Sequence, residues 1–100
     1  MDSFQTIMGS DQLVLIDFYA TWCGPCQMMP PILKQLKQNL GEKIRILKID
    51  VDKNPKVAAD YQVRGVPTLM LMAAGKTLWR QSGVVDAQSL TDIISQFLDK

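Results

Sequence analysis

The sequence LVLIDFYATWCGPC, residues 13–26, holds the feature around which the rest of the chain is organised. Its apolar first part, from Leu13 to Ala20, predicts a buried strand. Two cysteines, Cys23 and Cys26, follow this strand directly, and the segment after them has apolar residues at helical spacing. Both sulfurs are therefore expected at a junction between a strand and a helix.

This junction gives the first cysteine a special environment. A helix N-terminus offers unpaired backbone N–H groups and the positive end of a dipole, and both favour a thiolate over a thiol. Pro25 suits the first helical turn because its missing N–H needs no partner there, and Gly24 leaves the backbone near the sulfurs uncrowded. Cys23 alone is expected at the exposed end of the helix, and it is therefore the expected nucleophile.

The spacing of the two cysteines predicts a reactive disulfide. Side chains three residues apart on a helix have Cβ atoms about 5–6 Å apart, whereas a disulfide needs about 3.5–4.5 Å, so the turn must tighten to close the bond. The closed loop is too short to constrain the unfolded chain strongly. A disulfide between Cys23 and Cys26 is therefore expected to be labile rather than structural.

Composition limits the possible classes of function. One hundred residues predict one domain, 1–100, whose core needs no metal or disulfide framework. The formal net charge is +1 and the lysines are scattered, which argues against a nucleic-acid surface. No apolar run is long enough to span a bilayer and no export signal is recognisable, so we expect no membrane attachment and a reducing, cytoplasmic location.

Asp17 is the expected proton acceptor of the site. The sequence has no histidine, so proton transfer near neutral pH must use a cysteine or a carboxylate with a displaced pKa. Asp17 interrupts the apolar strand, and burial between helices should raise its pKa toward neutrality. The alternative is a core acid that hydrogen bonds hold for structure alone.

The other periodic segments predict an α/β fold. Phe4 begins a helix capped by Asp2 or Ser3, and Pro30-Pro31 should kink the helix that follows the cysteines, which ends at Gly41. The remaining expected elements are a strand at 44–51, a short helix capped by Asn54, a hairpin of strands at 68–72 and 77–82, and a last helix capped by Asp86. Right-handed crossovers then give a mixed sheet between helices, parallel in its first part and antiparallel at the hairpin.

The pentapeptide Trp22–Cys26, at a junction of strand and helix, resembles the active site of the thioredoxin family. The likeness extends from Phe4 to the end of the chain through features in the family's order and spacing: Asp17, the Asp52-Lys53-Asn54-Pro55 turn, Val66-Pro67-Thr68 and Gly83. It implies a three-layer fold, in which a mixed four-stranded sheet has helices on both faces.

The resemblance also implies a function and a role for each site residue. The chain would reduce protein disulfides by exchange, with Cys23 attacking the substrate, Cys26 resolving the mixed disulfide and Asp17 taking the proton of Cys26. Lys48 would lie near Asp17 and oppose the rise in its pKa, although a lysine on a strand can equally be a solvated side chain.

A platform for an extended substrate is implied as well. The family motif places a cis bond before Pro67, which leaves the preceding backbone free to pair with substrate. The implied substrate-binding residues are Trp22, Gly24, Pro25, Val66, Pro67 and Gly83. Electrons would come from NADPH through a separate flavin-containing thioredoxin reductase, and no cofactor is expected on the chain itself.

One departure from the family pattern concerns the sheet edge. Thioredoxins usually have an edge strand before the first helix, and here only Met1–Ser3 precede Phe4, so that strand is expected to be missing and 44–51 to form an edge. Lys43, Arg45 and Lys48 bring charge to this edge and should disfavour pairing with another chain. We expect a monomer, with an edge-to-edge dimer as the alternative.

Other classes of function use the same cysteine motif. A CxxC pair is also half of a zinc or iron–sulfur site, but without histidine or a second pair such a site could form only between two chains. A disulfide oxidase or isomerase shares the fold, and Gly24-Pro25 between the cysteines favours the reducing members of the resembled family. A non-catalytic scaffold would leave no mark in the sequence.

Overall fold

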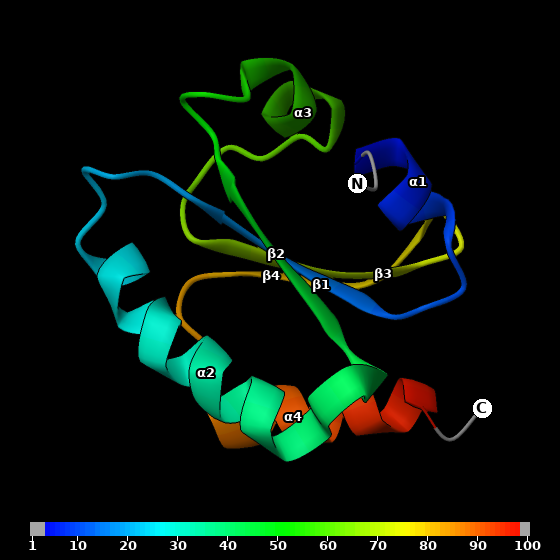
Figure 1. The fold of residues 1–100 in the computed structure, drawn as a ribbon. Coiled ribbons are helices and arrows are strands. Elements are labelled where there is room, and N and C mark those ends of the chain that lie inside the picture. Colours follow the sequence, from blue (N-terminus) through cyan, green and yellow to red (C-terminus); the bar gives the residue numbers. More distant parts are fainter. Residues whose placement is uncertain (1–3, 99–100) are drawn as a thin grey trace.

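The computed structural model describes residues 4–98 and is shown in Figure 1. Its elements, in chain order, are α1 (Phe4–Gly9), β1 (Val14–Tyr19), the 3₁₀ helix η1 (Pro25–Met28), α2 (Met29–Leu40), the 3₁₀ helix η2 (Gly41–Lys43), β2 (Arg45–Asp50), α3 (Pro55–Asp60), β3 (Thr68–Ala73), β4 (Lys76–Ser82) and α4 (Ala87–Leu98). The predicted order of helices and strands is confirmed, with the two 3₁₀ helices added.

The four strands form one mixed sheet in the order β2-β1-β3-β4. β1 pairs with β2 in parallel and with β3 antiparallel, and β3 and β4 form the predicted hairpin. The predicted mixed four-stranded sheet is therefore confirmed. In the described part of the chain β2 is an edge of the sheet. The segment before α1, where the strand was expected to be missing, lies outside the described residues. The caps expected at Asp2 or Ser3 lie outside the described residues.

Helices cover both faces of the sheet, as Figure 1 shows, with α1 and α3 on one side and α2 and α4 on the other. Because side chains alternate along a strand, β1 supplies both cores. Leu15 packs with the buried residues of α2 and α4, whereas Ile16 and Phe18 pack toward α1 and α3. Asp17, two residues after Leu15, therefore lies on the face that α2 and α4 cover.

The helix that carries the active-site turn differs from the prediction. Its first turn, η1, has 3₁₀ geometry, and α2 begins only at Met29. Pro30 and Pro31 therefore occupy the first turn of α2, where missing N–H groups break no hydrogen bond, instead of interrupting the middle of a helix. The change from 3₁₀ to α helix stands where the kink was predicted.

The other predicted helix boundaries had mixed outcomes. Asp86 caps α4, since its Oδ1 accepts the Ser89 N–H at 2.8 Å. Gly41, at φ +58°, ends α2. The side-chain cap predicted for Asn54 was wrong, because its Nδ2 donates to the Asp50 carbonyl at 3.0 Å instead.

Candidate active site

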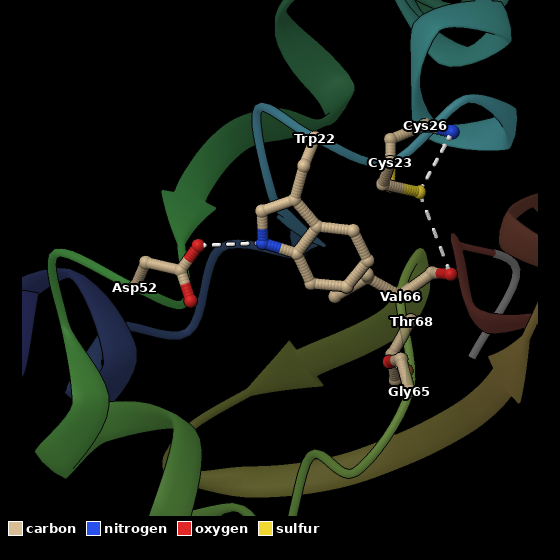
Figure 2. The surroundings of a disulfide bond; sticks show 7 residues. All are labelled: Trp22, Cys23, Cys26, Asp52, Gly65, Val66 and Thr68. Carbon is tan, nitrogen blue, oxygen red and sulfur yellow. Dashed lines mark hydrogen bonds between the residues drawn. A yellow bond between two sulfur atoms is a disulfide. The ribbon is translucent and has the colours of Figure 1, made fainter.

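A short loop between β1 and η1 brings the two cysteines together (Figure 2). They form a disulfide with a Cα–Cα distance of 5.3 Å. The Cys23 N–H donates to the Ala20 carbonyl at 3.2 Å, and the Gln27 N–H donates to the Gly24 carbonyl at 3.0 Å. The turn is thus a 3₁₀ turn, which confirms the expectation that it must tighten to close the disulfide.

Two backbone groups contact the sulfur of Cys23. The Cys26 N–H donates to it at 3.1 Å, and the Val66 carbonyl oxygen lies 3.6 Å away on the other side, as the dashed lines of Figure 2 show. A donated N–H stabilises negative charge on sulfur. This N–H would therefore support a thiolate at Cys23 once the disulfide is reduced, whereas the carbonyl oxygen of Val66 would accept from a thiol.

Burial does not distinguish the two cysteines. The exposed fraction is 4% for Cys23 and 5% for Cys26. The expectation that Cys23 alone stands at an exposed position was wrong for this disulfide form, because Tyr19, Val51 and Val66 pack against the cluster that contains both cysteines. The asymmetry between the cysteines lies in their hydrogen bonding: Cys23 receives the backbone donor, and Cys26 supplies it.

The loop before β3 faces the disulfide. The Val66–Pro67 bond is cis, as the motif predicted. Thr68 Oγ1 donates to the Gly65 carbonyl at 2.6 Å, and the Gly83 N–H donates to the Pro67 carbonyl at 2.8 Å, so residues from both ends of the hairpin fix this loop. The predicted substrate-binding residues Val66, Pro67 and Gly83 are thereby connected in one structure beside the cysteines.

Trp22 forms the exposed rim of the site. Its side chain is 71% exposed, and its Nε1 donates to Asp52 Oδ2 at 2.8 Å. Asp50, at the end of β2, accepts the N–H groups of Asp52 and Lys53 at 2.9 and 3.2 Å, which orders the turn that carries Asp52. A small pocket of about 90 Å³ lies between Trp22 and the loop of Val66.

Asp52 was not among the predicted site residues, although the sequence held a signal for it. Trp22 follows β1 and Asp52 follows β2, and these two strands were predicted to be parallel. Because parallel strands end at the same edge of a sheet, the two loops had to meet. The predicted pairing of the two strands, and not the residue type of Asp52, was thus the signal that placed Asp52 near Trp22.

Asp17 is buried on β1, with an exposed fraction of 2%, and its Oδ1 has no hydrogen-bond partner. Burial raises its pKa from 3.8 to about 6, and the charge of Lys48 lowers it by a smaller amount. Lys48 is exposed and lies level with Asp17 on the neighbouring strand β2. Among the described residues no hydrogen bond or ion pair joins the two, so Lys48 acts on Asp17 through its field.

Residues 4–98 contain no cluster of three or more histidine, cysteine or acidic side chains that could hold a metal ion. Over the same range, no helix has both the length and the apolar character that crossing a membrane requires.

Comparison with known proteins agrees with this site. A family model described as Thioredoxin matches residues 1–96. The thioredoxin-like protein slr0233 of Synechocystis sp. is 46% identical over 94 residues, which cover 94% of this chain and 90% of that protein. Thioredoxin Y1, chloroplastic, of Arabidopsis thaliana is 42% identical over 98 residues, and the match covers 97% of this chain but 57% of that longer protein.

A solved structure shows the same similarity in three dimensions. The structure of a mutant thioredoxin from Halobacterium salinarum NRC-1 matches with a TM-score of 0.83 and 38% identity. The match covers 97% of this chain and 87% of that one. With a cysteine pair at disulfide distance in the place where the family has its active site, the chain belongs to the thioredoxin family of thiol–disulfide oxidoreductases.

Proposed function

We propose that this chain reduces protein disulfides with Cys23 as nucleophile and Cys26 as resolving thiol. The Cys23 thiolate attacks one sulfur of a substrate disulfide, that bond breaks, and the released substrate thiolate takes up a proton. The observation that carries the assignment is the N–H of Cys26, which donates to the Cys23 sulfur at 3.1 Å and favours its thiolate.

The second half of the reaction requires a base. Cys26 must lose its proton before it attacks Cys23, forms the internal disulfide and releases the second substrate thiol. Asp17, whose pKa of about 6 suits proton exchange near neutral pH, takes this proton in our proposal. In the disulfide form Cys26 has no proton to donate, so a hydrogen bond to Asp17 is not required there.

The substrate segment lies, in our proposal, across the residues that surround the disulfide. Trp22, Gly24 and Pro25 border one side, and Val66, Pro67 and Gly83 border the other. None of these residues is charged, so main-chain pairing and apolar contact would hold the substrate. Such binding suits many different disulfide proteins.

We place the electron source in a separate flavin-containing thioredoxin reductase that uses NADPH, and the protein in the cytoplasm as a monomer. The use of both cysteines in one redox pair, with none for structural disulfides, supports a reducing compartment. The cationic side chains on the β2 edge support the monomer, because two such edges repel each other.

Coupled turnover tests this proposal. With NADPH, thioredoxin reductase and insulin, NADPH consumption should require the chain and stop when it is left out. Glutathione in place of the reductase system is the control, and it should support slower turnover. If only glutathione supports turnover, the proposed electron source is wrong. If scrambled disulfides are rearranged without net reduction, the chain is an isomerase.

A further inference from the structure

Within residues 4–98, β2 has one paired and one open side. The N–H groups of Arg45 and Val51 donate to the carbonyls of Leu13 and Tyr19 at 2.9 Å, so alternate residues of β2 turn their backbone toward β1. Ile46 and Lys48 occupy the other alternate positions of β2, so their N–H and C=O groups point away from β1. Such an open edge can accept a further strand.

A groove of about 460 Å³ runs between this edge and helix α2. It is lined by Pro30, Leu33, Lys34, Lys37, Arg45, Ile46 and Lys48. Four of these described lining residues are cationic and none is acidic. Lys37 donates a hydrogen bond to the Ile44 carbonyl, while Lys34 and Lys48 are exposed.

The source of the cations distinguishes two explanations. Charges on an edge strand alone would serve to prevent edge-to-edge association. Here Lys34 and Lys37 come from α2, across the groove from β2, and protection of the edge does not require them. Cations on both walls create a positive field inside the groove, which repels a second copy of this edge and attracts carboxylates.

We propose that β2 and this groove bind an extended acidic segment of a partner protein. The segment would add to the sheet beside β2 through the outward backbone groups of Ile46 and Lys48. Because side chains alternate along a strand, every second residue would point to the α2 side, where carboxylates meet Lys34 and Lys48. Pro30, in the first turn of α2, lies at the groove, so the bound partner would sit beside the active-site helix.

A peptide without cysteine tests this site apart from disulfide exchange. The probe is an acetylated eight-residue peptide of alternating Thr and Glu, and the matched control has Gln in place of Glu. We expect the Glu peptide to change the NMR chemical shifts of the Ile46 and Lys48 amides and to protect these amides from hydrogen exchange. Its affinity should fall as the salt concentration rises. The Gln peptide should bind at least roughly tenfold more weakly.

Charge reversal on α2 gives the second arm. Lys34→Glu should weaken binding of the Glu peptide roughly tenfold, because one attraction is replaced by a repulsion. Insulin reduction should stay at the wild-type rate. Lys76→Glu makes the same change at the exposed β3–β4 turn and should leave binding unchanged.

Three results would overturn the proposal. If the Glu and Gln peptides bind equally well, charge does not contribute to binding. If Lys34→Glu and Lys76→Glu weaken binding equally, the effect comes from the net charge of the protein and not from this groove. If the amides of Ile46 and Lys48 are protected from hydrogen exchange in the free protein, the edge is already paired. If that protection rises with protein concentration, the edge is paired with a second copy of the chain. Failure of insulin reduction would leave these peptide measurements unaffected.

Discussion

Cys26→Ser is expected to accumulate a covalent mixed disulfide with substrate proteins, whereas Cys23→Ser should form almost none. In Cys26→Ser the thiolate at Cys23 still attacks the substrate, but no second thiol remains to release it. In Cys23→Ser the serine hydroxyl is not a thiolate and cannot take the first step. Insulin turnover should fall to the background rate in both variants. Non-reducing gels and mass spectrometry measure the adduct.

The two variants control for each other, because each removes one sulfur and keeps the same fold. The double variant Cys23→Ser/Cys26→Ser gives the blank for adducts formed by other chemistry. Equal adduct formation by the two single variants would refute the assignment of nucleophile and resolving thiol. Since both residues are about equally buried, such a result could not be attributed to different exposure in the disulfide form.

Asp17→Asn should make the disulfide form more stable at pH 8. Burial raises the pKa of Asp17 from 3.8 to about 6, so the folded chain holds this proton more tightly than the unfolded chain. Stability therefore falls as pH rises from about 3.8 to about 6 and is lowest above that window. At about 1.4 kcal/mol per pKa unit the full loss is about 3 kcal/mol, and a neutral amide avoids most of it.

Urea unfolding at pH 4, 6 and 8 measures this difference. We expect the variant to gain about 1–3 kcal/mol at pH 8, most of that gain already at pH 6, and little at pH 4. Asp60→Asn is the matched control, since Asp60 is exposed in an ion pair with Lys56 and should change stability by less than about 1 kcal/mol. A variant less stable than wild type at pH 8 would contradict the burial argument.

The same substitution should slow the resolving step. Without the carboxylate of Asp17, Cys26 loses its proton only to solvent, and general-base catalysis contributes about a hundredfold or more. Rapid-quench measurement of the release of substrate thiol from the mixed disulfide, between pH 6 and 9, reports this step. An unchanged rate across that range would make Asp17 a structural residue only.

Much of the fold followed from the sequence because its periodic signals are strong. The apolar run at Leu13–Ala20 has one polar interruption, which allowed both the central strand β1 and the unusual position of Asp17 to be predicted. The apolar stripes of α2 and α4 predicted the two helices, and the structure then placed both on one face of the sheet. These features depend on neighbouring residues in the chain, and local pattern is what a sequence shows directly.

Features set by contacts between distant segments were harder to predict. The equal burial of Cys23 and Cys26 depends on packing against Val51 and against Val66, which is 43 residues from Cys23. The hydrogen bond from Trp22 to Asp52 joins two loops 30 residues apart. Helix propensity also could not distinguish the 3₁₀ turn of η1 from an α-helical turn, because both have similar backbone dihedrals.

The most direct test of the central claim is a single-turnover measurement of stoichiometry. The chain is fully reduced, freed of reductant and mixed with a protein disulfide, and all remaining thiols are then alkylated and counted by mass spectrometry. We expect one Cys23–Cys26 disulfide to form for each substrate disulfide that is reduced. The double variant Cys23→Ser/Cys26→Ser should reduce none. If the substrate stays oxidised and both cysteines of the chain are found as alkylated thiols, the chain is not the reductant.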